Sequence, residues 1–125
     1  PRKSGRIVVT TSMAGLAIEA GIGASYMAAK AGAAHLMRNA ALELAKYNIL
    51  VNAIAPGWFV TNIGGGWMKD KKVQDEVSQW VPLRRVGTLE DMKGLALFLS
   101  SPASSYITGT QITIDGGSLL GNVLD

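Results

Sequence analysis

Two short apolar runs on either side of a long alanine-rich stretch constrain the fold of this chain more than any other feature. The runs cover residues 5–11 and 50–55, and polar and apolar side chains do not alternate along them. Each run is therefore typical of a strand that is buried on both faces of a parallel sheet. Between them, residues 25–47 have the composition of a helix, with small side chains at most of positions 28–34. This order predicts two parallel strands joined by a right-handed crossover.

The second half of the chain continues the same alternation of helix and strand. Thr88 is typical of a helix N-cap, and acidic side chains follow it in the first turn. We expect this helix to end at about Ser100 or Ser101, because Pro102 cannot continue it. Residues 111–114 are a third strand candidate, closed by Asp-Gly-Gly. The sequence contains no internal repeat and no linker, so we predict one α/β layer system.

The carboxyl ends of the first two predicted strands carry residues suited to a ligand site. Ser12 follows the first strand, and Pro56 and Gly57 end the second. Tyr26 lies near the start of the intervening helix, on the same side of the sheet. Open α/β sheets bind their ligands at this edge, so we expect these residues to open onto one crevice.

Tyr26 and Lys30 are four residues apart at the start of the predicted helix. A helix places residues with this spacing on one face, one turn apart, which brings an ammonium near a phenol. Two unit charges about 4 Å apart interact by roughly 1 kcal/mol in bulk water and by about 4 kcal/mol in a surface cleft. The pair can therefore serve acid–base chemistry only in a partly dry site. Helices also carry this spacing by chance, so a catalytic interpretation depends on the surrounding motifs.

Residues 58–81 form a long segment between the second strand and the second helix. Three consecutive glycines at 64–66 provide a hinge, and Val73, Val77 and Trp80 recur at helical spacing among charged residues. One interpretation is a mobile amphipathic flap whose apolar side faces the crevice. The alternative is a surface helix whose valines and tryptophan cover core.

Composition argues against several other classes of function. The net charge of +3 is small, and the only basic cluster, at residues 69–72, has no interleaved aromatic side chains, unlike a nucleic-acid surface. The sequence has no cysteine and a single histidine, His35, so neither a disulfide nor a metal site is predicted. No apolar run reaches membrane-spanning length, and no signal peptide is recognised. We expect a soluble, cytoplasmic protein without nucleic-acid or membrane partners.

Five ordered motifs give the chain a strong resemblance to the short-chain dehydrogenase/reductase family. They are Ser12 after a buried strand, Tyr26-Met27-Ala28-Ala29-Lys30, Val51-Asn52-Ala53-Ile54-Ala55-Pro56-Gly57 with Thr61 behind it, Arg85-Val86-Gly87-Thr88-Leu89-Glu90-Asp91, and Ala103-Ser104-Ser105-Tyr106-Ile107-Thr108-Gly109 through Asp115-Gly116-Gly117. The resemblance implies a Rossmann-like, doubly wound parallel sheet of seven strands, of which this chain supplies the last three with their helices.

The resemblance also implies hydride transfer between a nicotinamide cofactor, NAD or NADP, and the carbon of a small-molecule alcohol or ketone. Tyr26 would be the general acid/base. Lys30 would favour the ionised phenol and bind the nicotinamide ribose, and Ser12 would hold the substrate oxygen near Tyr26. These three residues are the expected catalytic set. The expected cofactor-binding residues are Tyr26, Lys30, Pro56, Gly57, Phe59 and Thr61, and the expected substrate contacts are Met13, Trp58 and Trp67.

The serine assignment has an alternative, because Thr11 is a neighbouring hydroxyl. Ser12 is favoured because Met-Ala-Gly follows it, as in the family pattern. It precedes Tyr26 by fourteen residues, one more than the family spacing, which an extra residue in the intervening loop would explain. Phe59 stands where the family more often has an aliphatic residue.

The family's glycine-rich cofactor turn and its Asn-Ala-Gly segment do not occur in the sequence. We therefore expect residues 1–125 to be the carboxyl-terminal catalytic and substrate-binding half of a single domain, with residues 58–81 as its substrate flap. The first strand would then expose an edge of the sheet. The resemblance implies a homo-oligomer, a tetramer or dimer built by the two long helices. The contrasting hypothesis is a non-catalytic interaction module or an inactive fragment.

Overall fold

Three parallel strands form the sheet around which the chain is organised. The structure, a computed structural model, describes residues 4–121. Strands β1 (Gly5–Thr10), β2 (Ile49–Pro56) and β3 (Gln111–Ile114) lie in the order β1-β2-β3, and both pairs are parallel. The interior of β2 is buried, as expected for a central strand with a continuous apolar sequence. The predicted α/β class and the parallel strand–helix–strand unit are confirmed.

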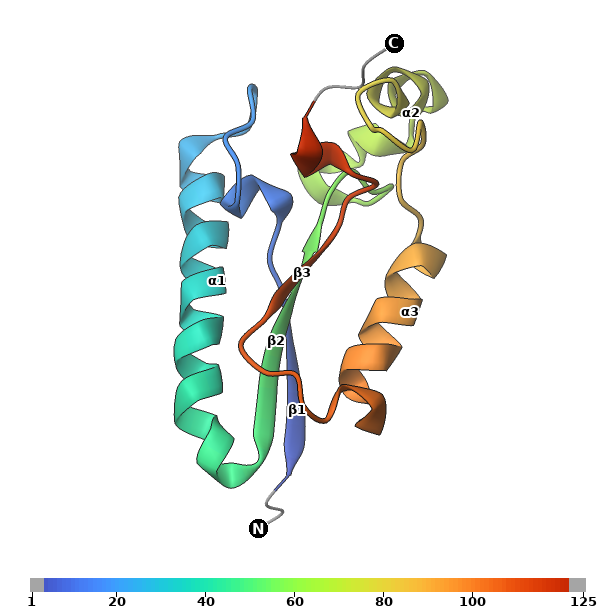
Figure 1. The fold of residues 1–125 in the computed structure, drawn as a ribbon. Coiled ribbons are helices and arrows are strands. Elements are labelled where there is room, and N and C mark those ends of the chain that lie inside the picture. Colours follow the sequence, from blue (N-terminus) through green and yellow to red (C-terminus); the bar gives the residue numbers. More distant parts are fainter. Residues whose placement is uncertain (1–3, 122–125) are drawn as a thin grey trace.

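Two long helices cover opposite faces of this sheet (Figure 1). Helix α1 (Ala24–Leu44) packs on β2, and α3 (Leu89–Ser100) packs on β1 and β2 from the other side. Met37 and Ala41 of α1 meet Val51 of β2 in the main buried cluster. The small side chains of α1 let the helix lie close to the sheet, and the result is a three-layer arrangement. Short helical turns cover Met13–Gly15, Ala45–Tyr47, Ile63–Gly65, Trp67–Lys69, Pro102–Ser104 and Ser118–Leu120.

Helix α1 ends three residues earlier than the sequence predicted. Residues Ala45–Tyr47 tighten into a 3-10 turn, and Asn48 follows in the left-handed region with φ 56° and ψ 35°. Asparagine tolerates this conformation better than most residues, so it ends helices in the way glycine does. The Asn48 N–H donates to the Ala45 carbonyl at 2.9 Å, and the chain then turns directly into β2.

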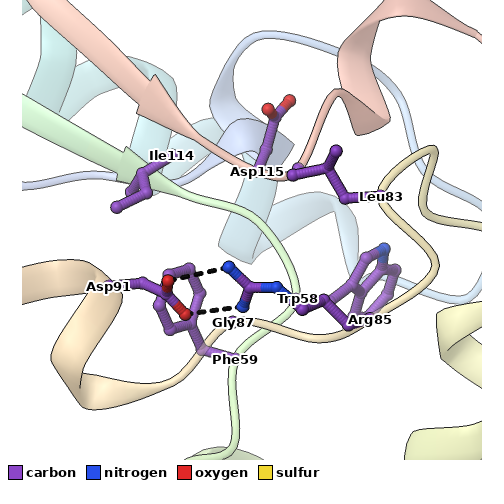
Figure 2. A pocket seen from close by; sticks show the side chains of 9 residues that line it. Trp58, Phe59, Leu83, Arg85, Gly87, Asp91, Ile114 and Asp115 are labelled. Carbon is purple, nitrogen blue, oxygen red and sulfur yellow. Dashed lines mark hydrogen bonds and ion pairs between the residues drawn. The ribbon is translucent and has the colours of Figure 1, made fainter.

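Helix α3 begins where the sequence predicted. Thr88 and Asp91 form a capping box, in which the Asp91 carboxylate accepts the Thr88 N–H at 2.8 Å. Arg85 donates two further hydrogen bonds to the same carboxylate, at 2.7 and 2.8 Å (Figure 2). Arg85 and then Thr88 hold the pKa of Asp91 well below its usual range. Because a lowered carboxyl pKa stabilises the folded state above the unfolded pKa, this contribution is lost only in acid.

Asn52, buried in the middle of β2, fastens the loop that precedes β3. Its side-chain amide donates to the Ile107 carbonyl at 2.9 Å and accepts the Thr110 N–H at 3.1 Å. Both backbone groups lie more than fifty residues away in the sequence. Asn52 therefore holds the loop together with Val51, whose N–H donates to the Thr108 hydroxyl at 3.1 Å and whose carbonyl accepts the Gly109 N–H at 2.7 Å. Strand β3 starts directly after the loop, at Gln111.

Residues 58–81 have a small core of their own around α2 (Lys71–Ser78). Val77 is buried and belongs to the same cluster as Met68. Trp80, in contrast, is 61% exposed and lines the cavity described below. The structure therefore shows Val77 covering core and Trp80 facing the crevice, and the mobile flap stays a prediction.

Strand β1 lies at the edge of the sheet in the described part of the chain. It pairs with β2 alone, and its Ile7 side chain is 42% exposed. An apolar side chain of a buried-type strand is thus accessible at this position. The predicted open edge is confirmed.

Candidate active site

The serine predicted for the site caps a short turn at the end of β1. Ser12 Oγ accepts the Ala14 N–H at 3.1 Å and begins the turn Met13–Gly15. This bond leaves the hydroxyl proton of Ser12 free to be donated. Gly15 brings the turn against α1, since a Cβ at Gly15 would lie 2.8 Å from the carbonyl carbon of Lys30. The serine turn and the start of α1 are therefore packed backbone to backbone.

We expect Gly15→Ala to lower the free energy of unfolding of the full-length protein by about 1–3 kcal/mol. The added methyl group would collide with the main chain of α1, which has no flexible side chain to move aside. Urea denaturation followed by circular dichroism measures the change. Gly32→Ala is the matched control, because nothing lies within 4 Å of its Cβ position and alanine favours the helix. Equal midpoints for the two variants would contradict the packing.

Helix α1 places the tyrosine and the lysine of the predicted pair side by side. Lys30 Nζ lies 5.7 Å from the centroid of the Tyr26 ring. The same ammonium donates to the Thr10 carbonyl at 3.3 Å, at the end of β1. The lysine charge is thus held between the helix and the strand end, beside the phenol.

The structure distinguishes between the two neighbouring hydroxyls at the end of β1. Thr11 is 2% exposed, and its hydroxyl donates to the Ile54 carbonyl of β2 at 3.1 Å. The hydroxyl proton of Thr11 is therefore taken by a hydrogen bond to the neighbouring strand. Ser12 is half-buried and keeps its proton for a ligand, so the geometry favours Ser12.

The loop after β2 is held by two close approaches to later parts of the chain. A Cβ at Gly57 would lie 2.7 Å from the Cβ of Asp115, so only glycine fits here without displacement. Phe59 is 8% exposed and forms an isolated parallel bridge with Gly87. Figure 2 shows Phe59 beside the ion-paired Arg85, where these residues line a small cavity of about 160 Å³.

Three tryptophans gather at one wall of the site. The ring centroids of Trp58 and Trp67 are 6.2 Å apart, and those of Trp58 and Trp80 are 6.1 Å apart. Both pairs meet edge to face, with interplanar angles of 80° and 67°. Edge-to-face contacts are a favoured aromatic geometry, so the three indoles support one another.

A second, larger cavity of about 530 Å³ brings these parts together. Its volume suits a medium-sized organic ligand. Lys30 does not line this cavity and lies beside Tyr26 instead. The other predicted site residues all line it, namely Ser12, Met13, Tyr26, Pro56, Gly57, Trp58, Phe59, Thr61 and Trp67.

Glu19 is the one charged residue among the cavity-lining residues that sequence reasoning did not name. It lies in the loop between the serine turn and α1, where burial raises the pKa of its carboxyl group. Its Oε2 atom is buried and receives no hydrogen bond within residues 4–121. Glu19 is the first acidic residue of the sequence, among apolar neighbours, and no other follows before Glu43. An isolated acidic residue in an apolar stretch was therefore the signal by which sequence reasoning could have found Glu19.

Comparison with known proteins identifies the family of this chain. The family model described as enoyl-(acyl carrier protein) reductase matches residues 1–118. The chain belongs to the short-chain dehydrogenase/reductase family. A tropinone reductase homologue of Arabidopsis thaliana is 42% identical over 115 residues, which are 91% of this chain and 42% of the relative.

Solved short-chain dehydrogenase/reductase structures share the fold. A gluconate 5-dehydrogenase from Burkholderia cenocepacia, in complex with NADP and tartrate, has a TM-score of 0.87 and 29% identity over 96% of this chain and 47% of that one. A 3-oxoacyl-[acyl-carrier protein] reductase from Brucella melitensis with bound NAD has a TM-score of 0.81 and 32% identity over 93% and 41%. The chain spans about half the length of the relatives it matches.

Two other kinds of feature are absent from the part of the chain that the structure describes. None of its helices has both the length and the apolar character that a bilayer crossing requires. No group of three or more potential metal ligands occurs within residues 4–121.

Proposed function

We propose that this short-chain dehydrogenase/reductase chain contributes the catalytic residues of an oxidoreductase. The reaction is hydride transfer between NAD or NADP and the carbon of an alcohol or ketone. One observation carries the proposal: Tyr26 and Ser12 line one cavity, and the Lys30 ammonium lies beside the Tyr26 ring. The relatives solved with NADP and with NAD support the choice of cofactor class.

We assign the proton transfer of this reaction to Tyr26. In reduction its phenol donates a proton to the carbonyl oxygen, and in oxidation the phenolate accepts one from the alcohol. The Lys30 ammonium, 5.7 Å from the centroid of the Tyr26 ring, attracts the phenolate that remains after donation. The Ser12 hydroxyl donates a hydrogen bond to the substrate oxygen and holds it near Tyr26. When bound, a nicotinamide dinucleotide supplies or accepts the hydride.

The donors at the site fit the nicotinamide end of such a cofactor. Lys30 uses one of its three N–H donors on the Thr10 carbonyl, which leaves donors for ribose hydroxyls. The Thr61 hydroxyl accepts the Ile63 N–H at 3.2 Å and retains its own proton for a carboxamide oxygen. The backbone at Pro56, Gly57 and Phe59 would line the nicotinamide pocket.

The proposal extends to assembly and location. Leu36 and Leu42 of α1 are 67% and 80% exposed, and Leu97 of α3 is 70% exposed. These leucines are apolar side chains that a homo-oligomer, a tetramer or dimer, would bury at the two long helices. We place the enzyme in the cytoplasm, and light scattering on the full-length protein measures its assembly.

The test of the activity is a turnover assay on the full-length protein. NADH and NADPH are offered in parallel with a panel of linear and cyclic ketones, and the loss of absorbance of the reduced cofactor is followed. We expect turnover with at least one cofactor, at a kcat of about 1–10³ s⁻¹ for a good substrate. If neither cofactor is consumed, and the corresponding alcohols reduce neither NAD nor NADP, the non-catalytic module replaces this proposal.

A further inference from the structure

A turn of three successive glycines leads into Trp67. Gly64, Gly65 and Gly66 have φ angles of 63°, 82° and 79°, so all three lie in the left-handed region. Residues with a Cβ atom adopt this conformation rarely, whereas glycine adopts it freely. The shape of the turn therefore depends on glycine at each of the three positions.

Gly64 approaches the Trp67 indole closely, and Gly65 does not. A Cβ at Gly64 would lie 3.0 Å from Cδ1 and 3.1 Å from Nε1 of the indole. Nothing lies within 4 Å of the Cβ position of Gly65. The pyrrole edge of the indole therefore rests against the backbone of Gly64, in the space that a side chain would fill.

A second contact holds the same indole. The Trp67 ring meets Trp58 edge to face, with the ring centroids 6.2 Å apart and an interplanar angle of 80°. Trp58 in turn packs on the buried cluster that includes Met68 and Val77. Edge-to-face packing on a close-packed support favours one position of the ring. Trp67 is thus held by the backbone of Gly64 and by the core of segment 58–81.

The indole of Trp67 also borders the large cavity. Trp67 lines this cavity of about 530 Å³, and 45% of the residue is exposed. A tryptophan that served only to cover core would be more fully buried. Because an indole is bulky, its position decides how much space a ligand has on this side of the cavity.

We propose that Gly64 is a positioning residue for Trp67, and that the indole in this position limits the size of the ketone that can reach Tyr26. Trp67 is then a specificity-determining residue, and neither Trp67 nor Gly64 takes part in the proton transfer. The size limit rests on the proposed function. The placement of the indole by Gly64 does not, because it can be measured without turnover.

The first experiment compares a small and a bulky ketone on the full-length enzyme. Cyclohexanone is the small substrate, and 4-phenylcyclohexanone adds an uncharged ring opposite the carbonyl group. In the wild type, we expect kcat/KM for the small ketone to exceed that for the bulky one by at least about tenfold. Trp67→Ala should raise the ratio of bulky to small by at least about tenfold, and Trp67→Phe, with a smaller ring, should give an intermediate ratio.

Phe98→Ala is the matched control for the loss of the indole. Phe98 of α3 is a 37% exposed aromatic residue that does not line the cavity. Its removal should leave the ratio of bulky to small ketone unchanged.

The second experiment compares Gly64→Ala with Gly65→Ala. Both variants place alanine at a positive φ, so they share the backbone cost, but only Gly64→Ala drives a methyl group against the indole. Near-ultraviolet circular dichroism, which reports the packing of aromatic side chains, should therefore change in Gly64→Ala and match the wild type in Gly65→Ala.

The same pair of variants separates KM from kcat. In Gly64→Ala a ligand has to return the displaced indole to its place, so KM for cyclohexanone should rise about 2- to 10-fold, the range of one aromatic contact. The kcat should stay unchanged, because the indole contributes to binding and not to the proton transfer. Gly65→Ala should change neither constant.

Each part of the inference can be overturned. A wild type that turns over both ketones equally, or an unchanged ratio in Trp67→Ala, would refute the size limit and leave the oxidoreductase intact. Identical spectra or identical KM values in the two glycine variants would refute the role of Gly64. A Tm of Gly64→Ala more than about 4 °C below that of Gly65→Ala would assign Gly64 to the stability of the segment instead. If the wild type turns over no ketone, the proposed function fails, while the spectra still decide the role of Gly64.

Discussion

Tyr26→Phe should lower the kcat of the full-length protein by about 10²- to 10⁴-fold, the range that a positioned general acid/base contributes. The variant keeps the ring, and with it the contact of Lys30 at 5.7 Å from the ring centroid, but it removes the only proton that Tyr26 can exchange. No other described residue that lines the cavity has an acidic phenol. Substrate binding should change far less, so KM should stay within a few-fold of wild type. Initial rates over a range of ketone concentrations separate the two constants.

Tyr106→Phe is the matched control for this substitution. Tyr106 is fully exposed and does not line the cavity, so losing its hydroxyl should leave kcat unchanged. Circular dichroism of both variants shows whether the fold is intact. A folded Tyr26→Phe enzyme that retains more than about a tenth of the wild-type kcat would refute the role of Tyr26.

Asn52→Ala should lower the free energy of unfolding by about 2–4 kcal/mol, a larger loss than the one expected for Gly15→Ala. The side chain is 1% exposed and makes two hydrogen bonds across the fold. Removing it leaves the Ile107 carbonyl and the Thr110 N–H without partners, and it opens space beside the central strand. The midpoint of urea denaturation of the full-length protein measures the loss.

Asn62→Ala provides the comparison, because Asn62 is exposed in the loop after β2. It should change the free energy of unfolding by less than about 0.5 kcal/mol. If Asn52→Ala unfolds at the same urea concentration as Asn62→Ala, then Asn52 does not hold the loop before β3.

The parts of the fold that depend on local sequence were predictable. The β-branched run at the start of the chain and the alanine-rich stretch after it specify β1 and α1 through burial and helix propensity. The capping box of Thr88 and Asp91 needs only four consecutive residues, so the start of α3 could be placed to the residue. The end of α1 could not, because the turn at Asn48 depends on a backbone conformation that many sequences could adopt.

The parts that depend on distant contacts were not predictable from the residues alone. Asn52 looked like an ordinary member of a buried strand, because its two partners lie more than fifty residues away. Glu19 has no motif around it, and only the fold of the loop before α1 brings it to the cavity. The segment 58–81 was ambiguous because one amphipathic pattern suits both a core-covering helix and a flap; Val77 covers core, and the flap stays a prediction.

Two sides of the large cavity are attached to different parts of the fold: the side of Tyr26, and the side formed by Trp58, Trp67 and Trp80. Tyr26 lines the cavity from α1, whose Lys30 is tied to the end of β1 through the Thr10 carbonyl, whereas Trp58 packs on a separate buried cluster that includes Met68 and Val77. Changes in segment 58–81 would therefore reshape the tryptophan side of the cavity and leave the proposed proton-transfer groups in their positions. For a protein engineer, this arrangement identifies residues 58–81 as the segment to randomise when a new ketone is wanted.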